Sequence, residues 1–281
     1  MEVVKKVEEV RARVDKEKRK GRVIGFVPTM GYLHQGHISL IKRAKQESDF
    51  VVVSIFVNPT QFGKNEDYDR YPRDIERDIK ILNEEKVDLV FVPEVKEIYP
   101  EGFNTWVYVE KYCDILEGKF RPGHFKGVCT VVLKLLNIVE PDKSYFGWKD
   151  AQQLIIIKKM VDDLNIKSEI IGCETIREED GLACSSRNIY LSDKDRKKAL
   201  CLYKALERIK ELVEKEKVID CKKLIAEGKK IIESEKGVKL DYLEIVRISD
   251  LSVVEKIEKG VIVLGAIKIK DVRLIDNLRF E

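Results

Sequence analysis

The sequence lacks several features, and each absence excludes a class of protein. No stretch approaches the roughly 20 apolar residues that a membrane-spanning helix needs, so we expect no membrane partner. The charged N-terminus holds no apolar core of the kind found in signal peptides. The six cysteines form no C-x-x-C pair, which favours reduced thiols and a cytoplasmic location over a disulfide framework.

The chain also lacks a large excess of either acidic or basic residues. The 53 basic and 50 acidic residues leave a net charge of +3, so the balance gives no reason to expect nucleic acid as a partner. Charged residues make up 37% of the chain, whereas glutamine and asparagine are scarce. Because such surfaces are typical of proteins that use ion-pair networks at high temperature, we expect a thermophile.

The first part of the chain alternates strand-like and helical patterns. The expected strands are 23–29, 50–57, 88–92, 105–109, 144–146 and 168–173, and the expected helices are 38–47, 71–85, 125–139 and 151–164, after a first amphipathic helix with Val3, Val4, Val7, Val10 and Val14 on one face. Nearly continuous apolar strands such as 51–57 are typical of parallel sheets that are buried on both faces. This alternation predicts an α/β fold, a Rossmann-like doubly wound parallel sheet.

The pattern changes after about residue 176. Lys/Glu-rich amphipathic helices are expected at 193–216 and 220–235, followed by strands at 240–246, 261–269 and 272–280. A chain of 281 residues favours two domains. We therefore expect a nucleotide-binding domain over residues 1–176 and a smaller C-terminal α+β domain over residues 177–281.

Two of the three histidines, His34 and His37, stand three residues apart between a predicted strand and a predicted helix. A helix N-terminus offers unpaired N–H groups and partial positive charge, which suits a phosphate. Gly31 and Gly36 let the backbone approach a ligand closely. A metal pair or plain surface residues are the alternatives, but a zinc site needs further ligands that this segment does not supply.

Three further segments follow predicted strands. Asn58 to Phe62 contains Gln61, whose amide suits a hydroxyl or carboxylate, although Asn-Pro is also ordinary turn chemistry. Phe146 to Gln153 again reads strand, glycine, helix, and one of its two adjacent glutamines is expected to be functional. The Ser-Ser-Arg run that ends at Arg187 predicts a polyphosphate clamp, and a serine-rich interdomain turn is the alternative.

The third histidine, His124, lies between two cations, Arg121 and Lys126, and directly before a predicted helix. This position suits an anion, so every histidine falls in a candidate ligand-binding segment. The sequence has neither G-x-x-x-x-G-K-[ST] nor G-x-G-x-x-G, so a nucleotide would need another mode of binding.

In order along the chain, PTMGYLHQGH, NPTQF, RPGHFKGV, FGWKDAQQ and GLACSSRN closely resemble the pantothenate synthetase (pantoate–β-alanine ligase) family. The resemblance is continuous from about residue 23 to 190. It extends to the wider nucleotidyltransferase group with an H-x-G-H element. It implies a homodimeric, ATP-dependent ligase that makes pantothenate, with Mg²⁺ carried on the ATP phosphates, no metal ligand from the protein itself, and the C-terminal domain acting as a lid.

The resemblance also implies roles for individual residues. His37 and His34 match the catalytic proton donor and its phosphate-binding partner, and Lys149 and Arg187 match catalytic phosphate contacts. The implied substrate ligands for pantoate and β-alanine are Gln61, Gln153, Asn58, His124 and Arg121. The implied ATP-binding residues are Met30, Gly31, Tyr32, Leu33, His34, Gln35, Gly36, His37, Gly147, Trp148, Lys149, Asp150, Ile176, Cys184, Ser185, Ser186 and Arg187. The chain departs from the family pattern at Trp148 and Cys184, where we expect the backbone to make the contacts.

Other functions remain as alternatives. An H-x-G-H nucleotidyltransferase could act on a different small acceptor, but uncharged amides suit hydroxyls and a carboxylate more than a phosphate. A noncatalytic nucleotide-binding protein would not need His34, His37, Lys149 and Arg187 together. A class I tRNA synthetase would need a longer chain and a basic surface for tRNA.

Overall fold

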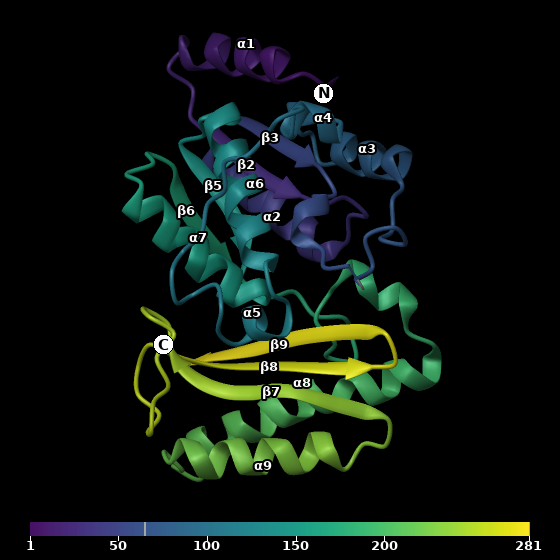
Figure 1. The fold of residues 1–281 in the computed structure, drawn as a ribbon, viewed down its shortest axis with the longest axis vertical. Helices are drawn as coiled ribbons and strands as arrows, with labels where there is room; N and C mark the ends of the chain where they lie inside the picture. The colour runs from purple at the N-terminus through teal and green to yellow at the C-terminus, as the bar shows by residue number, and fades with distance from the viewer. Residues whose placement is uncertain (65, 281) are drawn as a thin grey trace. The chain divides into compact units, whose positions relative to one another are not determined.

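The computed structural model describes residues 1–64 and 66–280, which form two compact units (Figure 1). The first unit comprises Met1–Trp148 and Gln152–Glu174. The second comprises Lys149–Ala151 and Thr175–Glu281. The chain therefore enters the second unit briefly at 149–151, before its main part begins.

The first unit is built on a parallel sheet in the order β1-β4-β3-β2-β5-β6. All of its paired strands run parallel, which confirms the predicted doubly wound α/β fold. The strands are β1 (Glu2–Val4), β2 (Ile24–Thr29), β3 (Phe50–Ile55), β4 (Leu89–Phe91), β5 (Lys143–Gly147) and β6 (Glu169–Cys173).

Helices cover both faces of this sheet, because its central strands are apolar on both sides. In β3, Val51 and Val53 pack in one core with α2 (Gln35–Glu47) and α3 (Ile75–Glu84). Phe50 and Val52 face the other core. That second core also contains residues of α1 (Val7–Lys18), α6 (His124–Val139) and α7 (Ala151–Asp163), while α4 (Val95–Ile98) and α5 (Glu117–Phe120) are short.

Two predictions about elements were wrong. Val3 and Val4 do not begin the first helix; they form β1, which pairs with β4 at the sheet edge, and α1 starts only at Val7. The segment 105–109 is not a strand. Its Val107 N–H donates to the Thr130 hydroxyl of α6 at 3.0 Å, so the segment lies against a helix and has the alternating burial of a strand without a partner strand.

The predicted helix at 71–85 begins later than expected, at Ile75. Asp74 caps α3 by accepting from the Arg77 N–H at 3.1 Å, which fixes the first turn. Before it, the Arg73 guanidinium donates to the carbonyls of Tyr68 and Tyr71, so the chain there is held as a loop.

The second unit is the predicted small α+β fold. Strands β7 (Val238–Arg247), β8 (Val261–Ile269) and β9 (Val272–Phe280) form an antiparallel sheet in that order. Apolar residues of α8 (Asp193–Glu214) and α9 (Cys221–Glu233) complete its core. The 3-10 helix η3 (Ser186–Tyr190) precedes α8. The bounds of β8 and β9 coincide with those expected from the sequence.

The sheet order places a topological switch point beside β2. From β2 the chain proceeds to β3 on one side, whereas β5 pairs with β2 on the other. Ligands of open α/β sheets bind outside the carboxyl ends of the strands at such a point. The histidine segment follows β2, the 3-10 helix η1 (Pro59–Gln61) follows β3, and η2 (Trp148–Asp150) follows β5.

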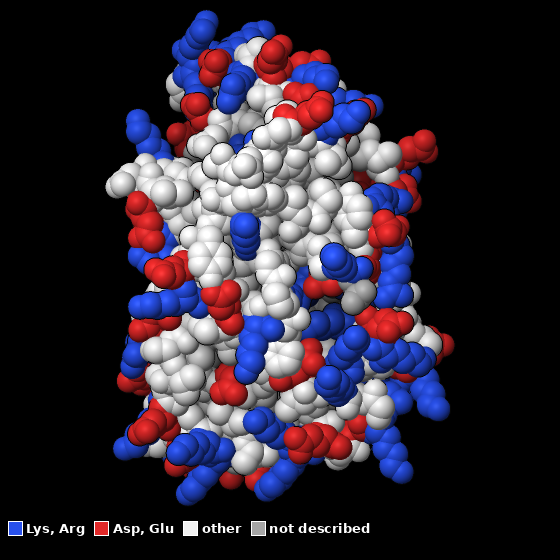
Figure 2. Space-filling model, in the orientation of Figure 1, with Lys and Arg blue, Asp and Glu red and all other residues white. Residues whose placement is uncertain are grey.

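Acidic and basic side chains are interspersed over the face drawn in Figure 2, as the near-zero net charge suggests. Within the part of the chain that the structure describes, no helix is long and apolar enough to cross a bilayer. Among the same residues, no group of three or more His, Cys, Asp or Glu side chains could hold a metal ion.

Candidate active site

The two histidines build the first turn of α2. His34 is the N-cap, and its Nδ1 accepts from the Gly36 N–H at 3.2 Å. Nδ1 of His37 accepts from the His34 N–H at 3.3 Å, and the two rings lie 4.1 Å apart between centroids. Because each Nδ1 accepts a backbone hydrogen bond, the neutral form of each imidazole carries its proton on Nε2. Nε2 of each ring is therefore a donor suited to an anion at this helix N-terminus.

A buried carboxylate holds the loop that leads into this turn. Asp78 of α3 accepts from the Tyr32 N–H at 2.7 Å and from the Leu33 N–H at 2.8 Å. Burial raises the pKa of Asp78, while the two backbone hydrogen bonds oppose that rise. Gly31 has a φ of +81°, and a Cβ there would lie 2.9 Å from the Asp78 Oδ2. A larger residue at 31 would therefore strain the backbone and crowd the carboxylate.

Asp78 is not among the residues that the sequence predicts for this site. Its signal was present in α3, where Asp78 stands four residues before the buried Leu82 and so lies on the buried side of the helix. A carboxylate on a buried helix face needs partners. Those partners, Tyr32 and Leu33, lie more than 40 residues away in the chain, so the sequence did not reveal them.

Gln61 is held from both ends of its amide. Its Nε2 donates to the Met30 Sδ at 2.9 Å, and its Oε1 accepts from the Asn58 Nδ2 at 3.1 Å. Asn58 in turn accepts from the Tyr99 hydroxyl at 2.9 Å and donates to the Gly127 carbonyl at 3.2 Å. Gln61 and Asn58 are both buried. The network fixes the orientation of the Gln61 amide, and it includes Tyr99, which the sequence motifs do not predict.

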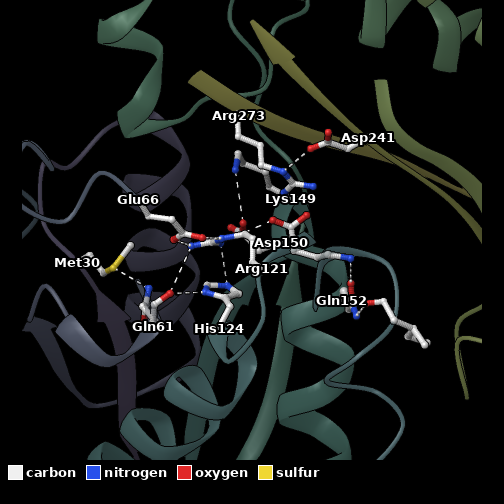
Figure 3. A network of polar contacts seen from close by, with 12 residues as sticks. Met30, Gln61, Glu66, Arg121, His124, Lys149, Asp150, Gln152, Asp241 and Arg273 are labelled. Carbon is white, nitrogen blue, oxygen red and sulfur yellow. Dashed lines mark hydrogen bonds and ion pairs between the residues drawn. The ribbon is translucent and has the colours of Figure 1, made fainter. Parts of the chain in front are cut away.

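His124 and Arg121 belong to the same neighbourhood, which Figure 3 shows together with Met30 and Gln61. Nδ1 of His124 lies 2.8 Å from the Gln61 carbonyl oxygen, and its Nε2 lies 3.0 Å from the Arg121 Nη1. Arg121 also pairs with Glu66 at 2.6 Å, so its charge is balanced within the protein. Both side chains support the Gln61 backbone, and their direct contact with a substrate stays a prediction.

The adjacent glutamines at the start of α7 differ in environment. Gln152 is buried, accepts from the Glu117 N–H at 2.9 Å and donates to the carbonyls of Tyr112 and Ile115 at 3.0 and 2.9 Å. It therefore holds the loop before α5. Gln153 is half-buried, and its role in substrate binding stays a prediction.

Gly147 ends β5, and Trp148 follows it. The Trp148 indole packs against β6: a Cβ on Gly172 would lie 2.5 Å from the indole Nε1. The Lys158 ammonium lies 5.9 Å from the centroid of the indole ring. Because the side chain is used for packing, we expect the backbone of Trp148, more than its indole, to contact a nucleotide.

The remaining predicted ATP ligands lie in the second unit. The Lys149 ammonium is 3.5 Å from the Asp150 carboxylate. The Cys184 N–H donates to the Ile176 carbonyl at 2.9 Å, so these two residues face each other across a tight hairpin. Beyond it, the Ser185 Oγ accepts from the Arg187 N–H at 3.3 Å and caps η3, in which Ser186 is buried. The hairpin and its cap fix the backbone that carries Arg187.

The match to known proteins covers the whole chain. Residues 2–279 match the family model described as pantoate-beta-alanine ligase. A pantothenate synthetase of Acetivibrio thermocellus is 52% identical over 281 residues, which is 100% of each chain. A pantothenate synthetase of Caldicellulosiruptor saccharolyticus is 53% identical over 283 residues, and each sequence is covered fully.

Solved structures agree with this match. A crystal structure of pantothenate synthetase from Thermus thermophilus has a TM-score of 0.95 and 46% identity, covering 100% of both chains. The pantoate-beta-alanine ligase of Francisella tularensis, complexed with beta-gamma ATP and beta-alanine, has a TM-score of 0.78 and 39% identity, covering 99% of this chain and 97% of that one.

Proposed function

The chain belongs to the pantoate-beta-alanine ligase family, and we propose that it joins (R)-pantoate to β-alanine through a pantoyl-adenylate, releasing AMP and pyrophosphate. The observation that carries this proposal is the histidine turn after β2. At a switch point of the sheet, the turn combines a helix N-terminus with two imidazoles whose Nδ1 atoms are occupied by backbone N–H groups.

In the first half-reaction, a carboxylate oxygen of pantoate attacks the α-phosphorus of ATP. The bond between that phosphorus and the bridging oxygen breaks, and pyrophosphate leaves with the electron pair. Negative charge therefore grows on the leaving group, where His34 and His37 donate hydrogen bonds from Nε2. Lys149 and Arg187 supply positive charge to the same phosphates. Rate enhancement in such a reaction comes mainly from positioning and electrostatics.

Gln61 and Gln153 bind pantoate in this proposal. An amide can accept from a hydroxyl and donate to a carboxylate, so it suits both groups of pantoate. The Gln61 amide is held by Met30 and Asn58 before any substrate arrives, so little side-chain freedom is lost on binding. Asn58, His124 and Arg121 complete the substrate site in this proposal.

In the second half-reaction, the neutral amine of β-alanine attacks the acyl carbon of the adenylate. The C–O bond to the phosphate breaks, AMP leaves with the electron pair, and the new amide nitrogen loses a proton. The acyl-adenylate is open to hydrolysis, so water must be kept away until the amine arrives. We assign this task to the C-terminal domain, residues 177–281, acting as a lid.

Exchange of labelled pyrophosphate into ATP tests the proposal. With pantoate present and β-alanine absent, exchange should occur, because adenylation is reversible. It should stop when pantoate is omitted. When ATP and pantoate are both present, adding β-alanine should release AMP and pantothenate in equal amounts. Exchange that does not depend on pantoate but requires a different acceptor would indicate another H-x-G-H nucleotidyltransferase activity.

Further properties belong to the same proposal. ATP is the nucleotide substrate, and Mg²⁺ rides on its phosphates with few protein contacts. The protein acts as a cytoplasmic homodimer, and light scattering after size-exclusion chromatography would measure its mass in solution. A mass near the 32.6 kDa of one chain would contradict the dimer.

A further inference from the structure

The edge strand β9 contains an unusual pair of buried polar residues, Asp276 and Asn277. Alternate residues of β9 belong to the core of the second unit; they are Val272, Leu274, Leu278 and Phe280. Asp276 stands on this same apolar face, because side chains two apart share a face. Asn277 stands on the opposite face. Both are buried, at 6% and 7% exposure. Buried polar groups need partners, so their contacts indicate why they are there.

Asp276 holds the hairpin that leads to Arg187. Its Oδ2 and Oδ1 accept from Nη1 and Nη2 of Arg177 at 2.6 and 2.9 Å, a bidentate ion pair. Arg177 also donates to the Gly181 carbonyl at 3.1 Å, and so closes the tip of the hairpin. Its guanidinium lies 4.7 Å from the centroid of the Tyr203 ring on α8. The arginine is therefore fixed by β9, by α8 and by its own hairpin.

The hairpin transmits this constraint to Arg187. Arg177 pairs with Ala183 as an antiparallel bridge. The next pair along the hairpin, Ile176 and Cys184, shares a backbone hydrogen bond of 2.9 Å. Arg187 follows three residues later in η3. The position of the Arg187 backbone thus depends on where Arg177 is held.

Asn277 holds the other segment. Its Nδ2 donates to the Lys149 carbonyl at 3.2 Å. Its own N–H donates to the Asp276 Oδ1 at 2.8 Å, which couples the two neighbours. Two adjacent residues of β9 thus contact both segments that carry the cations for ATP. The hairpin before Arg187 lies on the face of Asp276, and the Lys149 segment lies on the face of Asn277.

We propose that Asp276 and Asn277 are positioning residues that set the spacing between Lys149 and Arg187 for the ATP phosphates. Neither residue needs to touch ATP; each acts through the backbone of the segment it holds. This inference rests on the proposed function, because it takes Lys149 and Arg187 to be ATP ligands.

The experiment measures ATP affinity by titration calorimetry, and KM for ATP and for pantoate in the full reaction. Asp276→Asn weakens the ion pair, and Asn277→Ala removes the side-chain hydrogen bond to the Lys149 carbonyl. Each should weaken ATP binding by about tenfold, the loss expected for one buried hydrogen bond to a charged or fixed group. KM for pantoate should change by less than about twofold, because its ligands lie in the first unit.

Two comparisons separate positioning from general stability. Asp195→Asn weakens an ion pair of the same length, 2.6 Å, between Asp195 and Lys270 in the same unit, and it should leave KM for ATP unchanged. Adding Asp276→Asn to Arg177→Gln should weaken ATP binding little further than Arg177→Gln alone, because Arg177→Gln has already removed the ion pair to Asp276.

Unchanged ATP affinity in folded Asn277→Ala and Asp276→Asn proteins would overturn the inference. Asn277→Ala alone decides the matter if Asp276→Asn fails to fold. Lys149→Ala and Arg187→Ala test the premise separately. If these two variants bind ATP like the wild type, the assigned ATP ligands are wrong and the positioning role falls with them. If they bind weakly and the β9 variants do not, only the positioning role is wrong.

Discussion

At the residue scale, His37 has two separable roles. Its Nδ1 caps the His34 N–H, and its Nε2 is the group assigned to the phosphates. His37→Asn keeps an acceptor near the position of Nδ1 and removes Nε2. We expect pyrophosphate exchange to slow about a hundredfold or more, with little change in melting temperature. A near-normal exchange rate in the folded variant would refute the role of His37.

His37→Ala is the matched comparison. It should slow exchange as much as His37→Asn, since both lack Nε2. It should also lower the free energy of unfolding by about 1 kcal/mol, because a capping acceptor is lost. Urea unfolding of both variants measures this difference.

Asp78 is the second residue at which the structure makes a clear prediction. Asp78→Asn points an amide N–H₂ group at one of the two backbone N–H donors, which loses its partner. We expect the free energy of unfolding to fall by about 1–3 kcal/mol, and exchange to slow because the histidine turn loosens. Asp74→Asn on the same helix is the control, because asparagine caps a helix as well as aspartate. Equal stability of the two variants would contradict the role of Asp78.

Residues of this kind differ in how far the sequence reveals them. His34 and His37 could be predicted because both the residue type and the position between strand and helix are unusual. Asp78 and Tyr99 could not, because their importance lies in hydrogen bonds to residues 40 or more positions away. Gln152 is of a residue type that suits ligand binding. Its hydrogen-bond partners, which the sequence does not reveal, show that it supports a loop.

At the scale of elements, the contact between α6 and η1 depends on one glycine. A Cβ on Gly127 would lie 2.3 Å from the Thr60 carbonyl oxygen and 2.7 Å from the Gln61 nitrogen. Gly127→Ala should therefore displace η1, lower the free energy of unfolding by about 1–3 kcal/mol and raise KM for pantoate. Urea unfolding and steady-state kinetics would measure these effects.

Gly63 supplies the control for this prediction. It lies two residues beyond η1, and the nearest atom that a Cβ there would meet is the Glu66 Cγ, at 3.7 Å, an ordinary contact distance. Gly63→Ala should leave both stability and KM for pantoate nearly unchanged. If Gly127→Ala behaves the same way, close packing of α6 on η1 does not determine the pantoate site.

Strands could be predicted from the sequence where the buried residues also pair with a neighbouring strand. Both ends of β8 and the start of β9 follow from the apolar runs, since the turns Lys259-Gly260 and Lys270-Asp271 interrupt those runs. Burial alone misled at 105–109, because alternate burial describes a strand and also an extended segment that lies on a helix. Periodicity indicates which side chains are covered, and it says nothing of which groups the backbone bonds to.

At the scale of the whole molecule, ion pairs predict thermal stability. Glu17, which is buried, is surrounded by Lys20, Arg22 and Arg13. Networks of this kind stabilise most at high temperature, where desolvating a charge costs less. We expect a melting temperature above about 65 °C, beyond the range of most mesophilic domains. Calorimetry that gives a value near 50 °C would reject the thermophile assignment.

The thiols give a second prediction at this scale. All six cysteines are buried, and burial raises the pKa of Cys173, Cys201 and Cys221 to about 11. Because the thiolate is the reactive form, the folded protein should react very slowly with a disulfide reagent at pH 8. All six should react after unfolding in guanidinium chloride. Rapid reaction of one thiol in the folded protein would show local opening at that site.

The brief passage of the chain through the second unit at 149–151 limits how this enzyme can be taken apart. A single cut after residue 174 does not separate two complete modules, because the upstream fragment keeps Lys149 and loses the Asn277 amide that holds it. The segments before and after residue 174 therefore cannot be exchanged independently between related proteins. A chimaera would have to exchange 149–151 along with everything after 174, so recombination between relatives is constrained at a three-residue segment far from the obvious junction.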